Sequence, residues 1–432
     1  MTMIAPPHGL GGPPRVLIVA PNASSRSGGE SFLPLKYFEI LRRRGLPAKL
    51  VAHARNRSDL TQTLGPFLQD ILFVEDTFWH RAIWQAGRHF PNRIRELIFG
   101  AILTRVNSHY QVKLIRHLIA QGEVDVIHEP IPVSPRTPSS LHGFGVPVVI
   151  GPMNGGMTYP PGYEDYEGVM TRKLVGGARS LARVMNWLSP GKRRAAVLLV
   201  ANARTRAALP FQDHPDVVEL VENGVDQTIW ATAKRQPRAV DDSFRLVFMG
   251  RLVDWKAVDI TLDALSRARA QGIAATLDIL GDGPERARLE ARAAAPDLAG
   301  AVRFHGLLPQ SACRDIVSGM DALIINSVYE CGGAVVLEAM SLGLPIIASD
   351  WGGPADYVDD LCGILVHPVP RADFADRLAT AIGRLARDPA LRARMGHAGA
   401  AKVRAEYDWE KKVDRILEIY QRALAAAISP VR

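Results

Sequence analysis

The chain has 432 residues, of which 47% are apolar and 22% charged. This composition excludes a disordered or low-complexity protein, and the length suits two domains of about 150–200 residues each. The net charge of +8 lies entirely in residues 1–226, which hold 26 Lys and Arg against 18 Asp and Glu, whereas residues 227–432 hold 26 of each. An acidic partner, such as nucleic acid, an anionic lipid or a phosphorylated acceptor, is therefore expected at the first half.

The cysteines and the hydropathy of the sequence indicate the cellular compartment in which the protein works. Cys313, Cys331 and Cys362 form an odd set without Cys-x-x-Cys spacing, which argues against a disulfide scaffold or a zinc site and favours a reducing compartment. The N-terminus lacks a basic start followed by an apolar segment, and no apolar run reaches the roughly 18 residues that span a bilayer. We expect a cytoplasmic protein, with attachment to the inner face of the membrane left open.

Short apolar runs, each followed by a helical pattern, recur in both halves and are typical of parallel βα units. We therefore predict an α/β protein of two doubly wound domains. The expected strands are 15–21, 48–53, 71–75, 125–130, 147–152 and 197–202 in the first half, and 245–250, 275–280, 302–306, 322–327, 345–350 and 363–368 in the second. The polar, turn-rich stretch 223–243 is the expected linker.

Two segments of the first half admit two interpretations each. Loop 22–30 contains Gly28 and Gly29, which either allow a ligand to approach the backbone at a helix start or make a simple flexible loop. Segment 76–121 interleaves aromatic and basic side chains. It either lies on an anionic membrane surface or packs its aromatics in the core with the arginines solvated. No recognised nucleic-acid-binding motif accompanies this charge, so nucleic acid is not an expected partner.

The carboxyl ends of two further strands of the first half are candidate ligand contacts, because open α/β sheets bind ligands at that edge. The Gly-Pro, Asn-Gly-Gly and Pro-Pro steps of residues 150–163 indicate a shaped loop there. His128 ends a neighbouring strand and is either structural or a ligand contact.

A pair of cations follows a strand of the second half. Arg251 and Lys256 come after Gly250, where the chain turns into a helix. Two cations at the carboxyl edge of a sheet, beside a helix start, suit a diphosphate. Taken alone, the pair is also compatible with ordinary surface charge.

Two glutamates frame a glycine-rich turn in residues 327–340. The turn holds Gly332 and Gly333 before a helix, so free N–H groups and the positive helix end point at it. Such a site suits a phosphate or sugar oxygens, and Glu330 and Glu338 can accept hydrogen bonds from hydroxyls of a sugar and a ribose. The bare pattern is also that of an ordinary helix start, but with the cation pair it indicates a binding site.

The chain resembles the retaining glycosyltransferases of family 4 (glycosyl transferases group 1) over nearly its whole length, most strongly over 217–368. The matching pieces are VENGVD (221–226), MGRLVDWKAVD (249–259), LDILGDGPERARLE (277–290), VRFHGLLP (302–309) and ECGGAVVLEAMSLGLPIIASDWGGPADYV (330–358). The resemblance implies the GT-B fold, with two Rossmann-like domains facing a cleft. Residues 1–222 would form the acceptor-binding domain, 223–405 the nucleotide-sugar-binding domain, and 406–432 a C-terminal helix that crosses back to the N-terminal domain. Without the resemblance, the helical spacing of its apolar residues predicts a helix that packs its apolar stripe on its own domain.

The resemblance also implies roles for single residues. Arg251 and Lys256 would hold the donor diphosphate, Glu330 would meet hydroxyls of the donor sugar, and these three form the expected catalytic set. Glu338 would meet the nucleotide ribose. The other expected donor contacts are Gly28, Gly29, Gly250, Gly332, Gly333, Ala334, Val335 and the segment around Leu307.

The chain departs from the family after the strand at 147–150. Many members have a histidine there, whereas this chain reads Gly-Pro-Met-Asn. Asn154, Gly155 or Gly156 would substitute for it. Together with His128, these are the expected sugar or acceptor contacts.

Two milder departures lie in the donor motifs. The usual Lys-Gly pair is Lys256-Ala257, and the usual Glu-Gly start is Glu330-Cys331, whose thiol we interpret as a packing group. The resemblance implies retention of the anomeric configuration without a metal or cofactor. The leaving diphosphate would accept the acceptor's proton while the two cations stabilise its charge.

Three functions stay open at this point. The first is a hexosyltransferase that uses a UDP- or GDP-sugar and a saccharide or polyprenyl-diphosphate-saccharide acceptor in envelope or exopolysaccharide synthesis. Its basic first half would face an anionic membrane surface or a lipid diphosphate. The second is a GT-B sugar-nucleotide epimerase, which would need titratable residues near the sugar ring. The third is an inactive GT-B scaffold, which loses weight because both cations and both glutamates are present.

Overall fold

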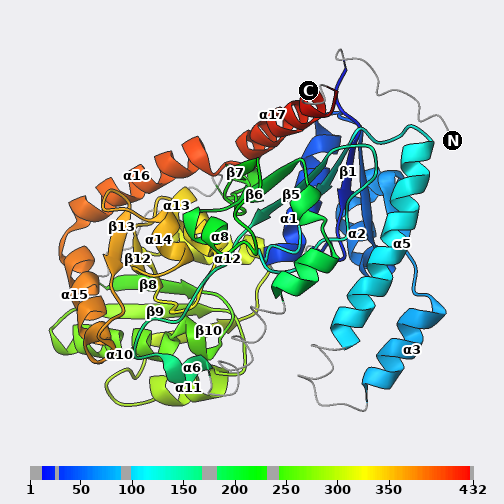
Figure 1. Ribbon diagram of the computed structural model, residues 1–432. Helices are drawn as coiled ribbons and strands as arrows, with labels where there is room; N and C mark the ends of the chain where they lie inside the picture. Colours follow the sequence, from blue (N-terminus) through cyan, green and yellow to red (C-terminus); the bar gives the residue numbers. More distant parts are fainter. Residues whose placement is uncertain (1–11, 25–28, 89–98, 168–181, 231–242, 429–432) are drawn as a thin grey trace. The chain divides into compact units, whose positions relative to one another are not determined.

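The computed structural model describes residues 12–24, 29–88, 99–167, 182–230 and 243–428 (Figure 1). These residues form two compact units. The first unit takes the described residues of 1–156, 177–222 and 413–432, and the second those of 157–176 and 223–412. Each unit is built on its own parallel sheet.

The first unit contains a seven-stranded sheet in the order β3-β2-β1-β4-β5-β6-β7, and every pairing is parallel. Its central strands are buried runs of branched apolar residues, as expected when helices cover both faces. The sequence predicted six of these strands and missed β7, which is three residues long and half-exposed. The strands are β1 Val16–Val19, β2 Ala48–His53, β3 Ile71–Val74, β4 Val126–Glu129, β5 Val148–Met153, β6 Val197–Val200 and β7 Val217–Glu219.

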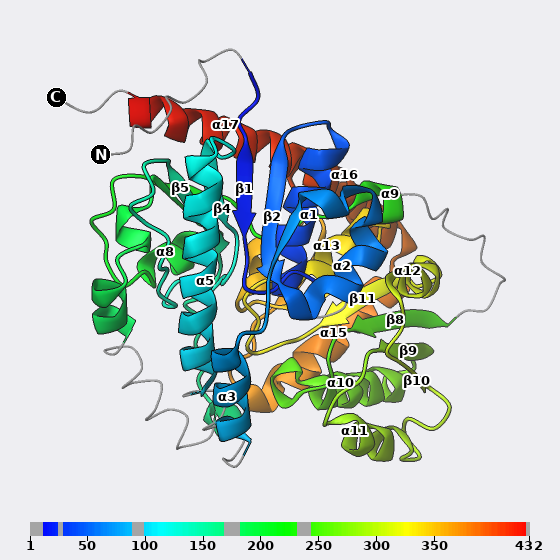
Figure 2. The same ribbon diagram turned by 90° about the vertical axis from the view of Figure 1, so that its right-hand side faces the viewer.

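Helices connect these strands, and the longest of them, α5, runs alongside the sheet with α3 packed against it (Figure 2). The helices of the first unit are α1 Gly29–Arg43, η1 Ala54–Asn56, α2 Arg57–Leu64, η2 Gly65–Asp70, α3 Phe78–Gly87, α5 Gly100–Ala120, η4 Lys192–Arg194 and α8 Ala203–Ala207.

The tail helix α17 spans Trp409–Ile428, and its residues from Val413 onward belong to the first unit. Val413, Ile416 and Tyr420 are fully buried, which places the apolar stripe of the helix against this unit. A helix with one apolar face needs such a partner to be stable. The structure therefore assigns the stripe to the N-terminal unit and not to the domain that immediately precedes the helix.

The second unit contains a six-stranded parallel sheet in the order β10-β9-β8-β11-β12-β13. All six strands lie where the sequence predicts them, within two residues at each end. They are β8 Phe244–Met249, β9 Ala275–Leu280, β10 Val302–Gly306, β11 Ala322–Ile325, β12 Ile346–Ser349 and β13 Gly363–Val366.

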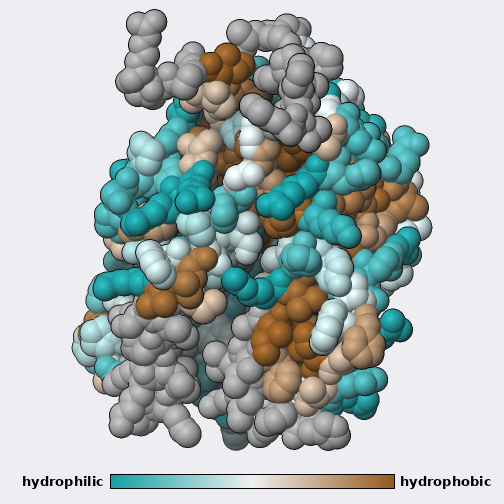
Figure 3. All heavy atoms as spheres, turned by 45° about the vertical axis from the view of Figure 1, so that its right-hand side comes forward, coloured by the Kyte–Doolittle hydropathy of each residue, from teal (hydrophilic) through white to brown (hydrophobic). Residues whose placement is uncertain are grey.

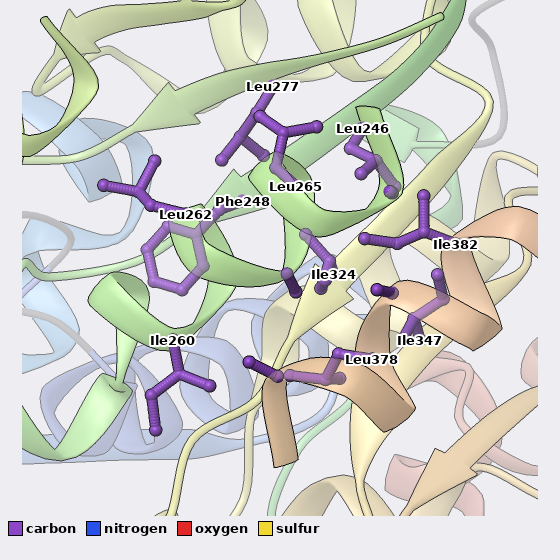
Figure 4. Close-up of a cluster of buried hydrophobic side chains, with 14 of the residues drawn as sticks. Leu246, Phe248, Ile260, Leu262, Leu265, Leu277, Ile324, Ile347, Leu378 and Ile382 are labelled. Atoms are coloured by element: carbon purple, nitrogen blue, oxygen red, sulfur yellow. The ribbon is translucent and has the colours of Figure 1, made fainter. Parts of the chain in front are cut away.

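A continuous apolar core joins the second sheet to helices α10 and α15, which pack against each other (Figure 4). Phe248 and Ile324 come from the sheet, and Leu262 and Leu378 from the two helices. The helices of this unit are α6 Glu164–Glu167, α9 Gln227–Trp230, η5 Asp254–Lys256, α10 Val258–Ala270, α11 Arg286–Ala293, α12 Gln310–Ser318, α13 Ala334–Ser341, α14 Gly353–Tyr357, η6 Arg371–Asp373, α15 Phe374–Arg387 and α16 Pro389–Glu406.

Residues 157–167 come from the first half of the chain but belong to the second unit. Tyr163 is fully buried in the core of that unit, and its hydroxyl donates a hydrogen bond of 3.0 Å to the carbonyl oxygen of Pro368. Arg371 lies over its ring and pairs with Asp165 at 2.7 Å. The expected N-terminal domain, residues 1–222, includes this segment, because local sequence gives no sign of contact partners that lie about 200 positions further along the chain.

Candidate functional site

The order of the second sheet places a ligand-binding edge between β8 and β11. These strands are neighbours, and the chain proceeds from them in opposite directions across the sheet. A doubly wound sheet binds ligands at the carboxyl ends of the strands where this reversal occurs. Arg251 and Lys256 follow β8, and Glu330 and the glycine-rich turn follow β11. The fold thus brings together the two motifs that the sequence singled out.

The loop after β8 is held tightly by its neighbours. The backbone N–H of Leu252 donates to the carbonyl oxygen of Asp282 at 3.0 Å. A side-chain carbon on Gly281 would collide with the carbonyl oxygen of Gly250, and one on Gly283 with that of Leu252. Glycine is therefore required at both positions, and the sequence GDG after β9 serves to fix the loop that carries the cations.

The end of this loop has a backbone conformation unusual for a residue with a side chain. Ala257 lies in the left-handed region with φ of 51° and precedes α10. The buried side chain of Asn326 donates to the carbonyl oxygen of Ala257 at 2.8 Å and also bonds the hydroxyl of Thr261. These contacts stabilise the strained residue and set the position of Lys256 before it.

Lys256 and Glu330 form an ion pair across the switch point. Their side chains are only 13% and 19% exposed, so solvent weakens their attraction less than it would at an open surface. Each side chain holds the other in place. Arg251 is exposed at the same edge, so the pair leaves one cation available to an incoming anion.

The glycine-rich turn leads into α13. Gly333 occupies the position before the helix with φ of 109°, and no described side chain caps the first N–H groups. The turn is held in shape because the N–H of Gly353 donates to the carbonyl oxygen of Glu330 at 2.7 Å. Uncapped N–H groups at a helix start attract anions and oxygen acceptors.

Glu338 lies on α13, one turn into the helix. Its side chain is partly exposed, but its surroundings raise the pKa of its carboxyl group to about 7, because burial disfavours the charged form. Gln310 donates to Oε1 at 3.1 Å and partly offsets this effect. The Leu307 side chain after β10 is 85% exposed, as an apolar contact for a ligand would be.

Comparison with known proteins identifies the kind of domain that contains this edge of the second sheet. Residues 231–402 match the family model described as Glycosyl transferases group 1. The second unit is a group 1 glycosyltransferase domain. Arg251, Lys256, Glu330 and Glu338 all lie within the matched residues of this glycosyltransferase domain.

Relatives and solved structures extend the comparison beyond the glycosyltransferase domain. Alpha-maltose-1-phosphate synthase of Mycobacterium tuberculosis is 32% identical over 248 residues, which cover 53% of this chain and 64% of that protein. The chain thus matches just under two thirds of the length of this relative.

Two solved structures resemble the whole chain. Anabaena HepE, in complex with UDP and glucose, has a TM-score of 0.61 at 18% identity and covers 94% of this chain and 99% of its own. Sucrose-phosphate synthase of Thermosynechococcus elongatus has a TM-score of 0.63 at 18% identity and covers 95% and 99%. At this identity the likeness establishes the fold, which is GT-B with two Rossmann-like domains.

Candidate residues of the first unit lie outside the glycosyltransferase domain. Gly28 lies outside the described residues, and Gly29 begins α1 at the surface. His128 is completely buried, and both ring nitrogens are bonded: Nε2 donates to the carbonyl oxygen of Gly151 at 2.6 Å, and Nδ1 accepts from the Tyr420 hydroxyl at 2.6 Å. Burial lowers the pKa of His128 to about 4. We therefore interpret this histidine as a structural residue that anchors the tail helix.

The Asn-Gly-Gly turn is likewise packed within the first unit. The Asn154 side chain donates to Glu222 at 2.8 Å and is buried. A side-chain carbon on Gly155 would contact Pro135, and one on Gly156 would contact the carbonyl oxygen of Arg204. These residues shape the end of β5, where Asn154 and Gly155 are buried and Gly156 is partly exposed, and their contact with a sugar or acceptor stays a prediction.

Sequence reasoning missed an aromatic contact beside the donor motif. The ring of Tyr159 stacks on that of Tyr329, with centroids 4.7 Å apart. Tyr329 directly precedes Glu330, so the segment 157–167 helps to position the glutamate. The Pro-Pro step of this loop predicted a shaped turn, but it did not predict that the loop packs on the second unit.

The exposure of the aromatic side chains in segment 76–121 distinguishes between the two environments predicted for them, an anionic membrane surface and the core. Phe78, Trp79 and Trp84 on α3 are 70%, 60% and 54% exposed. The interpretation that these rings fill the core is therefore wrong. Phe90, in the same predicted segment, lies outside the described residues.

Proposed function

We propose that the chain is a retaining hexosyltransferase that moves a sugar from a UDP- or GDP-sugar to a lipid-linked or polysaccharide acceptor in envelope or exopolysaccharide synthesis. The observation that carries the proposal is the Lys256–Glu330 pair beside the uncapped start of α13 at the switch point of the second sheet. The presence of UDP and glucose in the HepE structure supports a nucleotide-sugar donor.

Each element of the site has a role in this proposal. Arg251, Lys256 and the first N–H groups of α13 bind the donor diphosphate. Glu330 accepts hydrogen bonds from hydroxyls of the sugar, and Glu338 from those of the ribose. The base lies against Leu307.

The reaction needs only these groups and the two substrates. The bond between the anomeric carbon and the donor's phosphate oxygen breaks, and the acceptor hydroxyl forms the new bond on the same face of the sugar. The leaving diphosphate takes the acceptor's proton, while Arg251 and Lys256 stabilise the negative charge that develops on it. In this scheme the two cations do the work that a divalent metal performs elsewhere, so we expect activity without added metal.

A thermal-shift screen with UDP, GDP, ADP and their sugar conjugates tests the donor. A ligand at 100 times its Kd stabilises the fold by about 2.7 kcal/mol, which is a shift of several degrees. We expect one nucleotide family to stabilise the wild type and to lose that effect in Lys256→Ala, while Arg394→Ala, an exposed arginine on α16, behaves as wild type. No stabilisation by any nucleotide would contradict the proposal.

We also propose that the first unit lies against an anionic membrane, at its cytoplasmic face. The exposed rings of Phe78, Trp79 and Trp84 share α3 with Arg81, and Arg88 directly follows the helix. Apolar side chains interrupt the polar surface on the face that Figure 3 shows. Aromatic rings next to cations suit the interface of an anionic bilayer. Among the described residues, no helix has the length and hydropathy of a membrane span.

Flotation with vesicles of phosphatidylglycerol and phosphatidylcholine tests this surface. We expect binding at low salt that weakens as salt rises, because the cations supply part of the attraction. The double variant Phe78→Ser with Trp79→Ser should stay in the soluble fraction. Absence of binding at low salt would remove the membrane from the account without affecting the donor site.

A further inference from the structure

Residues 157–163, which we call the strap, lie across the carboxyl ends of three strands of the second sheet. They follow β5 in the chain but belong to the second unit. The strap makes one contact after each of three neighbouring strands, with Tyr329 after β11, Trp351 after β12 and Pro368 after β13. Since parallel sheets bind ligands at this edge, the strap lies beside the candidate donor site.

The ring of Tyr159 holds the residue that precedes Glu330. It stacks on the ring of Tyr329 with centroids 4.7 Å apart and an angle of 25° between the ring planes. Both residues are half-buried, and stacked rings of this kind stabilise each other. Glu330 is the next residue in the chain, so the stack restricts the backbone from which its carboxylate extends.

The short loop after β12 connects the strap to Glu330 by a second route. The indole N–H of Trp351 donates to the carbonyl oxygen of Thr158 at 2.8 Å. At Gly352, φ is 73°, and a side-chain carbon there would collide with both the Met157 side chain and the carbonyl oxygen of Glu330. The strap and the donor turn therefore pack on one loop that has no space for a side chain at this point.

The far end of the strap is fixed in the core of the second unit. Tyr163 is fully buried there, and its hydroxyl donates to the carbonyl oxygen of Pro368 at 3.0 Å. The ring of Tyr166 stacks on that of Tyr163, and Arg371 lies over both rings. A segment that is anchored in a core at one end and packed on Tyr329 at the other is a rigid support. A carboxylate that binds a ligand needs such support to keep its position.

We propose that the strap positions Glu330 for the sugar part of the donor, with Tyr159 as the positioning residue. The inference rests on the proposed transferase function, in which Glu330 accepts hydrogen bonds from sugar hydroxyls. The groups assigned to the diphosphate, Arg251, Lys256 and the first N–H groups of α13, lie after β8 and on α13. Loss of the strap contact should therefore weaken the binding of a nucleotide sugar but not that of the free nucleotide, since Lys256 is held by its own loop.

Calorimetric titration of the full chain tests the proposal. The probes are UDP with UDP-glucose, GDP with GDP-mannose and ADP with ADP-glucose, of which the pair that stabilises the wild type in the thermal-shift screen is used. Tyr159→Ala should bind the nucleotide sugar roughly tenfold more weakly than the wild type and the free nucleotide as tightly. Tyr159→Phe keeps the stack and should bind both ligands as the wild type does. A role in folding alone would not separate the two affinities.

Two further variants test how the strap acts. Trp351→Phe keeps an aromatic ring and removes the N–H that bonds Thr158, so it should weaken nucleotide-sugar binding by about threefold and leave nucleotide binding unchanged. Tyr166→Ala is the matched control, because it removes a ring of the same chain segment that stacks on Tyr163 in the core. It should lower the Tm without changing the ratio of the two affinities.

Glu330→Gln distinguishes failure of this inference from failure of the proposed function. If Glu330→Gln weakens nucleotide-sugar binding but Tyr159→Ala does not, the strap has no positioning role and the donor site stands. If Tyr159→Ala weakens the binding of both ligands by the same factor, the strap supports only the fold, which also overturns the inference. If Glu330→Gln binds the nucleotide sugar as tightly as the wild type, or if no nucleotide binds the wild type, the proposed donor site fails and the inference fails with it.

Discussion

Replacing Glu338 with glutamine should stabilise the ligand-free protein above pH 7 and weaken its binding of the nucleotide. Burial raises the pKa of this carboxyl group from an ordinary 4.5 to about 7. Between these values the unfolded chain has released the proton while the folded chain still holds it, so the stability that the wild type gains from this group falls as pH rises through about 7. Glutamine is neutral at every pH, so the variant does not lose stability in this way as pH rises.

The size of the effect follows from the two pKa values. The difference between 4.5 and about 7 corresponds to about 3 kcal/mol if the shift is complete. The side chain is partly exposed, so we expect about 1–3 kcal/mol. The hydrogen bond from Gln310 survives in the variant, because the glutamine oxygen can still accept it. The ribose loses a charged acceptor, which should weaken nucleotide binding about tenfold or more.

Urea unfolding of both proteins at pH 5.5, 6.5 and 8.0 measures this difference. The stability of Glu338→Gln relative to wild type should grow by about 1–2 kcal/mol over that range, because part of the effect already lies below pH 5.5. Calorimetric titration with the nucleotide at pH 8.0 gives the affinity. A stability difference that does not change with pH would refute the raised pKa, and unchanged nucleotide affinity would refute the ribose contact.

Three further predictions concern the donor loop and the tail helix. Lys256→Ala should lower kcat/KM about 100-fold in a transfer assay and leave the circular dichroism spectrum unchanged; near-wild-type turnover would remove its role at the diphosphate. Gly281→Ala should destabilise the second unit by about 2–3 kcal/mol in urea and abolish nucleotide binding, because the new methyl group collides with the carbonyl oxygen of Gly250; normal stability would show that the loop is not held there. Tyr420→Phe should cost about 1–3 kcal/mol by leaving His128 Nδ1 buried without its donor, and an unchanged unfolding midpoint would contradict that assignment.

Most of the strands that the structure describes follow from local sequence pattern. Buried parallel strands are short runs of branched apolar residues, and both sheets consist of such runs, so twelve of the thirteen strands were predictable. β7 was not, because its Val217–Glu219 run is short and half-exposed. An edge strand of this kind is defined by its pairing with β6 and carries little signal of its own.

The residues of the candidate donor site were singled out from the sequence one by one, but the contacts between them could not be predicted. Lys256 and Glu330 each follow a strand, which is a local feature, but their pairing spans 74 positions and depends on β8 lying beside β11. The role of His128 could not be predicted, since its partner Tyr420 is 292 positions away. A histidine at a strand end has the same local sequence whether it faces a ligand or a tail helix.

Hydrogen–deuterium exchange with and without the stabilising nucleotide-sugar tests the central claim most directly. The uncapped N–H groups at the start of α13 should exchange freely in the ligand-free protein, and exchange there and in the hydrogen-bonded loop after β8 should slow when the donor binds. We predict protection in peptides that cover 250–257 and 332–338. If the donor slowed exchange only in peptides of the first unit and left these two peptides unchanged, the assignment of the donor site to the glycosyltransferase domain would be contradicted.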